Sequence, residues 1–584
     1  MPETNIPISP SYREIAPSNG YKFTGGGGCT LPEYPFVEPP ELKSNTVVRH
    51  PVVIVGGGIT GLTLACSLAR LGVKAVLLDQ DNTEGVKGAS SRGICYTQKS
   101  LEIFHRLGIY ERIAKKGIQW SVGRTFAGHD EVYSFDLRHQ SNFNLSTQPP
   151  FINIQQFYIE GFLVERIYEL GNVELRWKSR VTAFRQNDEF ATLTVETPAG
   201  SYLVEADHVI DATGCTTPFH QWCAATMQTK RDDDRWCSAD VRFTKHPPVE
   251  RHTWIEAPFN ENRAVWQHLM ADDVWRIDYQ MAPHADPAFV SCEDVVRERL
   301  ARQFGQDVDV EIVWVGSYPY RSQCLDQLRI GRVFFMGDTA KIVSPFGARS
   351  GNTGVADADN LAWKLAAVLR GQATPALLDS YNDERHEAAR QNMSVSNRTA
   401  RFLRPADGVE RLFRNAAISL AKQHVFARSL INTGRMAVAN TYTHSRICEA
   451  TGGQSVQNVA FGWANGESGT NGTRAGTEGM VNDLLTWAQG HLLVLVFGDL
   501  SVAASQRLRQ LAAGTPVRCV QVVGGDGQPQ AREHVRDPKG HLQGACHVFG
   551  HAWALVRPDG YLAATGEAMD DKLIQAIEKC LGHL

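Results

Sequence analysis

The feature that most constrains the fold is a β-branched run ending in three glycines, PVVIVGGG, at residues 51–58. Such a run is typical of a buried strand that enters a tight turn. The segment ITGLTLACSLARLG follows with helical spacing, and KAVLLD at 74–79 has the pattern of a second buried strand. This strand–helix–strand unit of about 30 residues predicts an α/β fold class.

Glycines in this unit form a GxGxxG pattern, at Gly56, Gly58 and Gly61, and Asp79 closes the second strand. The first glycine permits the tight turn, the second lets the backbone approach a pyrophosphate, and the third lets the helix pack on the strand. The helix N-terminus then faces the phosphates, and the Asp79 carboxylate can accept hydrogen bonds from an adenosine ribose. The pattern predicts a dinucleotide site without distinguishing NAD from FAD. The alternative is a glycine-rich turn that binds nothing.

A second glycine-rich region, GRVFFMGDTAKIVSPFGARSGNTGV at 331–355, distinguishes the two cofactors. A predicted strand ends at Gly337 and Asp338, and a loop then leads into a helix. An Asp at a strand end can hold a ribityl hydroxyl, and a helix N-terminus can stabilise negative charge on a reduced flavin. Arg349 adds a full positive charge there. Together with the first motif this region favours FAD. Taken alone, it would be a capping Asp followed by turn glycines.

These motifs resemble those of the group A flavoprotein aromatic hydroxylases, a family that includes 3-(3-hydroxyphenyl)propionate and phenol hydroxylases. The resemblance covers about residues 51–400 and implies a bound FAD. It also implies NADPH or NADH and dioxygen as co-substrates, and hydroxylation of a phenolic, aromatic small molecule through a flavin hydroperoxide. The FAD-binding positions of the family fall on Gly56, Gly58, Gly61, Asp79, Arg92, Gln156, Gly337, Asp338, Pro345 and Asn352.

Three positions bear on how the pyridine nucleotide is handled. The ADGxxS motif of the family, whose Asp supports both FAD and pyridine nucleotide binding, is ATGCTT here, with Thr213 in place of the Asp. The GDxxH pattern ends in Lys341. Arg321 resembles an arginine that helps to hold the pyridine nucleotide, and the alternative is a surface arginine. The choice between NADH and NADPH therefore stays open.

Changes in composition along the chain predict its domains. The first 50 residues are rich in Pro, Gly and polar residues, which is typical of a surface arm or a partly disordered segment. The middle of the chain alternates aromatic and β-branched residues, as antiparallel sheets do. The expected order is an N-terminal arm at 1–50, an FAD-binding domain at 51–232 and 317–400, a substrate-binding sheet at 233–316, a helical connection at 401–454 and a thioredoxin-like domain at 455–584.

The expectation of a thioredoxin-like domain comes from RPDGYLA at 557–563, an ending that phenol hydroxylase relatives carry. Cys519, Cys546 and Cys580 lie far apart and form no CxxC, whereas disulfide exchange needs a neighbouring thiol pair. We therefore expect this domain to be structural or a dimer contact, in a protein that forms a homodimer.

Alternation in the middle sheet suggests substrate residues. Trp266, His268 and Met270 share one face of a predicted strand, and Asp278 and Gln280, with Arg276, share a face of the next. His268 is the candidate base, because a reference pKa near ~6.5 suits removal of a phenol proton. The alternative is a histidine that is only hydrogen-bonded in the sheet. Met270 aligns with the carboxylate-binding arginine of para-hydroxybenzoate hydroxylases, which favours a neutral or larger phenolic substrate.

The bulk composition favours a small molecule as the partner. A net charge of −4 and a pI near 6.6 give no long-range attraction to nucleic acid or an anionic membrane. No secretory signal or ligand-spaced Cys/His cluster is present, so we expect a cytoplasmic protein without a metal. Two other functions stay open: another flavin oxygenation such as epoxidation, or a non-catalytic protein that binds flavin or an aromatic compound.

Overall fold

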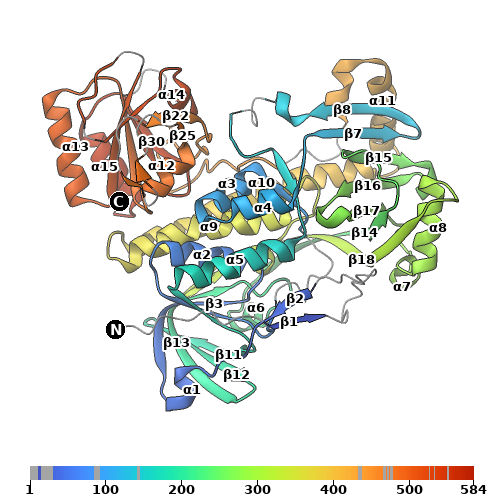
Figure 1. Cartoon of the computed structure of the whole chain (residues 1–584), viewed down its shortest axis with the longest axis horizontal. Helices are drawn as coiled ribbons and strands as arrows, with labels where there is room; N and C mark the ends of the chain where they lie inside the picture. The colour runs from blue at the N-terminus through green and yellow to red at the C-terminus, as the bar shows by residue number, and fades with distance from the viewer. Residues whose placement is uncertain are drawn as a thin grey trace.

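The computed structural model describes residues 11–14, 30–83, 93–140, 145–431, 437–463, 468–469, 472–473, 478–524, 527–531, 533–548 and 552–583. Figure 1 shows an α/β body that contains β3 and β13, a second sheet around β14, and a separate C-terminal body of strands and helices. The predicted α/β fold class is confirmed by this mixture of parallel strands and helices. Among the helices of the described residues, none is both long enough and apolar enough to cross a membrane.

The first sheet is built on five parallel strands, in the order β10-β4-β3-β13-β20. Its strands, with the antiparallel extension β12 and β11 and the short β19, are β10 Val173–Arg176, β4 Ala75–Leu78, β3 Val48–Val55, β13 Gly200–Asp211, β20 Val333–Phe335, β12 Ala191–Thr197, β11 Arg180–Gln186 and β19 Arg329–Ile330. Parallel strands bring the loops at their carboxyl ends to one edge, which is where open α/β sheets bind ligands.

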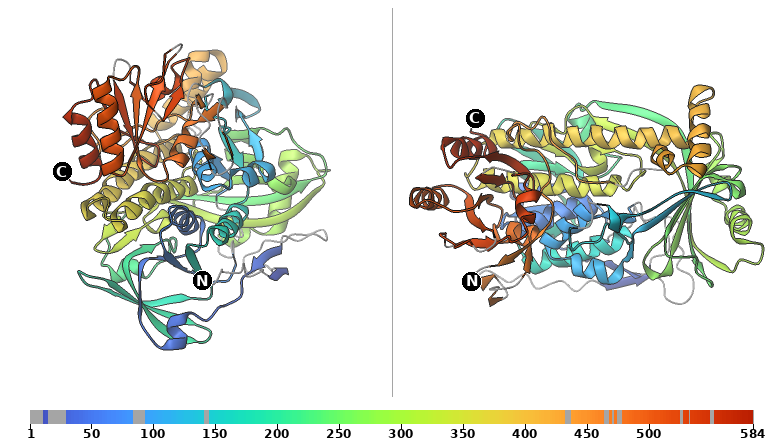
Figure 2. Two further views of the ribbon diagram at one scale, coloured as in Figure 1. Left: turned by 60° about the vertical axis from the view of Figure 1, so that its left-hand side comes forward. Right: turned by 90° about the horizontal axis from the view of Figure 1, so that it is seen from above.

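Helices pack together over this sheet. α2 (Ile59–Arg70) packs against both α5 (Gln156–Leu170) and α9 (Ser350–Leu369), and α9 packs against α10 (Asp379–Leu403). Every residue of α2 except Arg70 is buried, since its Ala, Ser, Thr and Gly residues let neighbouring elements approach closely. Figure 2 shows α9 and α10 as two long helices that run along the molecule toward the C-terminal body.

Several smaller elements complete this part of the chain. A three-stranded sheet has the order β5-β9-β6, and β5 leads directly into α3. The bounds are β5 Cys95–Thr97, β9 Phe151–Asn153, β6 Ile118–Trp120, α3 Gln98–Leu107, α4 Tyr110–Lys116, α6 Phe219–Trp222, and the antiparallel pair β1 Ser11–Glu14 and β2 Thr30–Glu33.

From Tyr34 onward the predicted N-terminal arm lies on the first body, with most of residues 35–49 exposed or partly exposed. Tyr34 is buried and stacks on Trp177, with ring centroids 4.6 Å apart. α1 (Pro40–Ser44) packs on β13, and its buried Glu41 forms an ion pair with Arg176. Composition did not predict this packing because it depends on single side chains in a segment that is otherwise polar.

The second sheet has the strand order β21-β18-β14-β17-β16-β15-β7-β8, antiparallel throughout except between β15 and β7. One face is apolar and packs against α8 (Glu293–Phe304), while the opposite face carries polar and charged side chains. The bounds are β21 Lys341–Ile342, β18 Val310–Leu325, β14 Met227–Phe243, β17 Trp275–Gln280, β16 Arg263–Leu269, β15 Arg251–Ala257, β7 Val122–Ala127 and β8 Asp130–Asp136.

This sheet extends beyond the predicted range 233–316, so those boundaries are wrong. β7 and β8 come from 122–136, and the ends of β14 and β18 reach into the segments that the sequence assigned to the FAD-binding domain. Pairing between strands far apart in the chain leaves no local pattern. The predicted helical connection at 401–454 is also only partly helical. It holds the end of α10, then α11 (Val409–Gln423) and the 3-10 helix η7 (Val425–Leu430), and its described residues from 437 onward form no helix.

The C-terminal body is a sheet in the order β25-β22-β28-β27-β26-β29-β30. α13 and α15 cover one face, and α12 and α14 cover the other. β26 is parallel to β27 and antiparallel to β29. The thioredoxin-like assignment stays a prediction. The bounds are β22 Ala460–Trp463, β25 Glu478–Met480, α12 Val481–Trp487, β26 Leu492–Phe497, α13 Val502–Gly514, β27 Val517–Val523, β28 His534–Arg536, α14 His541–Ala545, β29 Trp553–Val556, β30 Leu562–Gly566 and α15 Asp571–Cys580.

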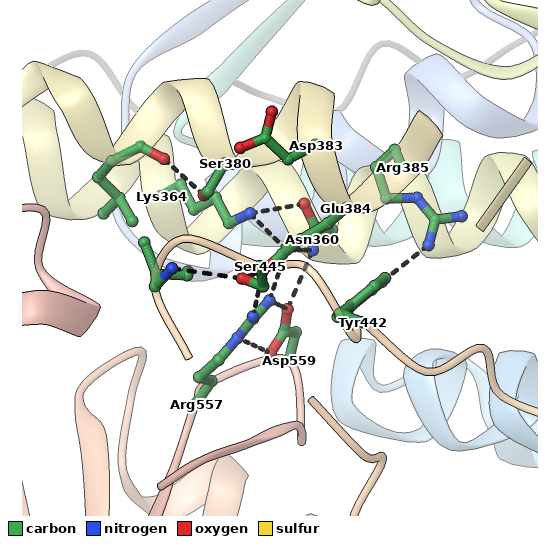
Figure 3. Close-up of polar contacts among 12 residues, drawn as sticks. Asn360, Lys364, Ser380, Asp383, Glu384, Arg385, Tyr442, Ser445, Arg557 and Asp559 are labelled. Carbon is green, nitrogen blue, oxygen red and sulfur yellow. Dashed lines mark hydrogen bonds and ion pairs between the residues drawn. The ribbon is translucent and has the colours of Figure 1, made fainter. Parts of the chain in front are cut away.

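A buried ionic cluster joins the C-terminal body to α9 and α10 (Figure 3). Arg557, just after β29, donates to both carboxylate oxygens of Glu384 on α10, with Nη2 and Oε2 2.9 Å apart. Lys364 on α9 donates to the same carboxylate over 2.7 Å, and Asp559 accepts from Arg557. Burial alone would raise the pKa of Glu384, but the charges of Arg557 and Lys364 hold it below its ordinary range. The cluster therefore docks the C-terminal body onto the two long helices.

Removing Arg557 should destabilise this junction. Because breaking a buried pair leaves uncompensated charge, Arg557→Met should lower the free energy of unfolding by about 3–5 kcal/mol. Arg446→Met is the matched control, since Arg446 pairs with Asp383 at an exposed position, and it should cost less than about 1 kcal/mol. Urea unfolding followed by circular dichroism measures both losses. Equal, small losses in the two variants would contradict this role of the cluster.

The C-terminal thiols should be chemically unreactive in the native protein. Burial raises the pKa of Cys519 and of Cys546 to about 12, and it also raises the pKa of Cys580. The thiolate is the reactive form, so we expect slow labelling of these thiols by dithiobis(nitrobenzoate), against fast labelling of the exposed Cys215 and Cys292. Peptide mass mapping of a labelling time course measures the difference. Labelling of the C-terminal thiols as fast as that of Cys215 would count against a redox-inert domain.

Candidate active site

A cavity of about 940 Å³ opens at the carboxyl edge of the first sheet. It is lined by the loops that follow β3, β4 and β13, and by the 3-10 helix η5 (Gly337–Thr339) that follows β20. The fold thereby brings together predicted residues that lie far apart in the sequence. Those that line this larger cavity are Gly56, Gly58, Asp79, Gln156, Gly337 and Asp338.

Each glycine of the first turn is needed for a different geometric reason. Gly56 has a φ of +110°, and a Cβ there would lie 2.5 Å from the Ala212 carbonyl oxygen. A Cβ on Gly61 would lie 2.0 Å from the Gly56 carbonyl oxygen, so Gly61 serves the packing of α2 and does not line the cavity. At Gly58 the nearest atom to an added Cβ is Glu160 Oε1, 3.9 Å away. A side chain at Gly58 would therefore occupy cavity space that the protein leaves open beside the backbone.

Two carboxylates fix the turn around the N-terminus of α2. Asp79 Oδ2 accepts from the Gly57 backbone N–H over 2.5 Å. Glu160 Oε1 accepts from the Ile59 backbone N–H over 2.9 Å and from Gln156 Nε2 over 2.8 Å. Glu160 is buried, so it holds Gln156 in the cavity wall and leaves the Gln156 carbonyl oxygen as the end of the amide that can accept from a ligand.

Lys341, which stands where the resembled family has His, points away from both cavities. Its ammonium forms a buried ion pair with Asp357 of α9, and Arg385 Nε donates to the other oxygen of that carboxylate over 2.6 Å. Asp357 also accepts from the Gly337 backbone N–H over 3.0 Å. Lys341, the departure from the GDxxH pattern, thus helps to anchor the loop that carries Gly337 and Asp338 to the long helices.

A smaller cavity of about 390 Å³ adjoins the larger one, and Cys215, Thr216, Asp338, Ser350 and Gly351 line both. On one side lies the polar face of the second sheet, and on the other lies the loop that leads into α9. The side chains from the sheet include Ser238, Arg251, Trp266, His268, Arg276 and Asp278, and those from the loop include Pro345, Arg349 and Asn352.

The charges of this polar face are mostly compensated within the sheet. Arg276 forms a buried ion pair with Asp240, with Nε and Oδ1 2.6 Å apart. Asp278 accepts a hydrogen bond from Ser238, and burial raises its pKa. Burial, with the nearby Arg251 and Arg276 charges, lowers the pKa of His268 well below its ordinary value. At neutral pH His268 is therefore an uncharged imidazole, and its buried Nδ1 has no hydrogen-bond partner among the described residues.

Two predicted substrate residues lie outside the smaller cavity. Met270 lies one residue past the end of β16 and is fully buried against Val274, Val313 and Trp314. Gln280 shares the face of Asp278, but its side-chain oxygen accepts from the Ala264 backbone N–H, over 3.2 Å. Met270 and Gln280 therefore do not line the smaller cavity, and a role for them in binding the substrate stays a prediction.

Arg251 is a charged cavity residue that sequence reasoning missed. It is buried in β15, and its guanidinium lies over the rings of Trp120 and Trp266, 5.9 and 5.8 Å from their centroids. Because the Arg251 guanidinium lines the cavity, Met270 no longer supports the inference that the far end of the substrate is neutral. The signal was present as alternation, since β15 buries Arg251, Thr253 and Ile255 and turns the residues between them outward.

The structure describes the remaining predicted residues to different extents. Arg92 lies outside the described residues, and Arg321 lies in β18 with a side chain that is not described. Asn352 accepts from the Thr97 backbone N–H over 3.0 Å and donates to the Cys95 carbonyl over 2.8 Å. Arg349 donates to the Phe346 carbonyl, and burial lowers its pKa to about 10, which leaves it charged at neutral pH. Asn352 and Arg349 thus shape the loop that faces the polar sheet.

Comparison with known proteins gives related flavoproteins. The chain is 28% identical over 356 residues to a flavin-dependent monooxygenase of Mycobacteroides abscessus, which covers 59% of this chain and 73% of that protein. It is 25% identical over 422 residues to a 3-(3-hydroxy-phenyl)propionate/3-hydroxycinnamic acid hydroxylase of Burkholderia cenocepacia, covering 70% and 74%. The structure of the flavin-dependent monooxygenase PieE in complex with FAD and substrate has the same fold, with a TM-score of 0.74 at 21% identity over 92% of this chain and 99% of PieE.

The family model described as FAD binding domain matches residues 49–396, which is more than half of the chain. The matched range contains the loops that line the larger cavity and every strand of the second sheet. It also contains each motif on which the resemblance to the group A flavoprotein aromatic hydroxylases was based. That resemblance is confirmed, and the chain belongs to the FAD binding domain family.

Proposed function

We propose that this protein is a single-component FAD-dependent monooxygenase that hydroxylates a phenolic small molecule, with NAD(P)H and dioxygen as co-substrates. The observation that carries the proposal is the pair of adjoining cavities. The larger one has the backbone shape of a dinucleotide site, and the smaller one is walled by the polar sheet face and is of the size that small-molecule sites have. The hydroxylase activity named for the relatives supports the same assignment.

The residues of the larger cavity fit FAD. Gly58 leaves backbone open to a pyrophosphate at the N-terminus of α2, where anions are stabilised. Asp79 lies at the end of β4, where it would hold the adenosine ribose, and Asp338 lies where both cavities meet and would hold the ribityl chain. When bound, FAD supplies the electron transfer and the activation of dioxygen that side chains cannot provide.

The residues of the smaller cavity would bind and prepare the aromatic ring. Trp266, stacked on Trp236 at 4.7 Å, gives the cavity a rigid apolar wall, and the buried surroundings exclude water. His268 Nδ1 would accept the phenol proton, because it is uncharged and has no partner among the described residues. Its lowered pKa makes it a weaker base than an exposed histidine. Asp278, whose pKa is raised, is the other candidate for accepting that proton.

The test of the proposed reaction is consumption of NADH and NADPH by purified protein, with and without each member of a phenol panel. We expect at least one phenol to accelerate consumption and to gain one oxygen atom, measured by product mass. An epoxidase would give the same mass gain on an alkene without a new phenolic hydroxyl. A non-catalytic binding protein would retain flavin while no compound accelerated consumption.

Retention of FAD should depend on Gly58. Purified protein should be yellow and release FAD, not FMN, on denaturation. Gly58→Val should abolish retention, because its side chain would fill the space that the pyrophosphate needs. Gly514→Val is the control, since Gly514 ends α13 with nothing near an added Cβ. Chromatography of the released flavin measures both. A Gly58→Val protein that keeps its FAD would show that the larger cavity is not the cofactor site.

Removing the His268 imidazole should uncouple the reaction. If His268 takes the phenol proton, His268→Ala should keep FAD and slow hydroxylation by ~10²-fold or more. NAD(P)H oxidation should continue with more hydrogen peroxide released, and raising the pH toward the pKa of the phenol should restore part of the product. His252→Ala is the control, since His252 lies on the neighbouring strand, outside the cavity, beside Glu250.

Coupling is measured as product formed per NAD(P)H consumed. If His268→Ala couples like the unaltered protein at neutral pH, His268 is a structural histidine. Asp278→Asn, assayed in the same way, then tests the remaining candidate for the base.

A further inference from the structure

A buried carboxylate lies at the centre of the edge that forms the larger cavity. Asp211 is the last residue of β13, and in the sheet register it stands between Val55 of β3 and Phe335 of β20. The loops that begin after these three strands all line the cavity. The side chain of Asp211 has no exposed surface, and it was not among the residues that the sequence singled out.

Three hydrogen bonds from the following loop satisfy this carboxylate. Asp211 Oδ1 accepts from the Thr213 backbone N–H over 3.1 Å and from the Thr213 hydroxyl over 2.7 Å. Asp211 Oδ2 accepts from the Thr217 hydroxyl over 2.8 Å. No lysine or arginine pairs with it among the described residues. Burial raises its pKa to about 6, while the bonds from Thr213 and Thr217 act in the opposite direction. A buried anion without a cation is costly, so the loop donors are what make its presence possible.

The loop held by Asp211 forms one wall of the cofactor cavity. Residues 212–217 all line the cavity. The Ala212 carbonyl oxygen lies 2.5 Å from the position that a Cβ on Gly56 would take. The Gly214 backbone N–H donates to the Thr339 hydroxyl over 2.9 Å, which ties this loop to η5. A substitution at Asp211 would therefore also affect two further parts of the cavity wall, the glycine turn and the loop that carries Asp338.

We propose that Asp211 is a positioning residue for FAD. From inside the sheet, Asp211 takes over the role of the acidic residue that the resembled motif has at the position of Thr213. The resembled motif has its acidic residue in the loop itself, at the position of Thr213. Here the carboxylate stands two residues earlier and acts on the loop through Thr213 and Thr217. This inference rests on the proposed FAD site and adds a residue to it. A purely structural Asp211 would affect the stability of the protein without a separate effect on FAD affinity.

The first experiment compares Asp211→Asn with Asp207→Asn. Asp207 is on the same strand, partly exposed and paired with Arg49, so the control removes a carboxylate without touching the loop. Apoprotein of each variant is titrated with FAD, and the Kd is read from flavin fluorescence. The Tm of each apoprotein is recorded separately. We expect Asp211→Asn to raise the Kd for FAD at least tenfold and to shift the absorption bands of the bound flavin. Asp207→Asn should stay within twofold of the unaltered protein. A Kd within twofold for Asp211→Asn would overturn the inference.

The second experiment tests whether Asp211 acts through the loop, and it remains informative if Asp211→Asn does not fold. Thr217→Val should weaken FAD binding, whereas Thr217→Ser, which keeps the hydroxyl, should bind like the unaltered protein. In a double-mutant cycle, the change in Kd caused by Asp211→Asn and Thr217→Val together should be smaller than the product of the two separate changes. Independent effects, or equal binding by the Val and Ser variants, would overturn the inference. Failure of the unaltered protein to bind FAD would overturn the proposed function instead.

Discussion

The close approach of three backbone segments at the carboxyl edge of the first sheet is the constraint on which the rest of the structure depends. Gly61 lets α2 contact the Gly56 carbonyl, and Gly56 lets the turn contact the Ala212 carbonyl. A methyl group at Gly56 or Gly61 would push these segments apart, because interiors at this density have no space to absorb it. The wall of the larger cavity is therefore made by backbone, and its shape follows from how closely the segments meet.

Two buried carboxylates fix the loop that carries Asp338 and the two long helices behind it. Asp357 binds the Gly337 N–H, Lys341 and Arg385, and Glu384, the neighbour of Arg385 on α10, binds Lys364 and Arg557. Since a buried charge is tolerated only with its partners in place, each cluster holds the elements that supply them at one distance. α9 and α10 contribute to both clusters. The C-terminal body is thus tied, through two helices, to the loop that carries Asp338.

The second sheet shows where local patterns stop being informative. Alternation correctly placed Trp266, His268 and Asp278 on the cavity side, because all three lie inside regular strands. It did not show that Met270, one residue past the end of β16, is covered by Val274, Val313 and Trp314 and does not line the cavity. The same alternation in β15 puts Arg251 on the cavity side, and this residue was not predicted. The reference pKa of histidine was also a poor guide to His268, since its ionisation depends on burial and on two arginines from other strands.

The sequence by itself determined the family, the cofactor class and the glycines of the turn, because these depend on two short motifs, at 51–79 and 331–355, and on which residue types a tight turn accepts. Only the tertiary structure decided which strands join the second sheet, what lies in the wall of the smaller cavity and how each buried charge is compensated. The physical reason is that strand pairing, burial and charge compensation each depend on segments that are distant in the chain. Asp211 is an ordinary strand-end residue in the sequence, and its place among three cavity loops appears only when β3, β13 and β20 lie side by side.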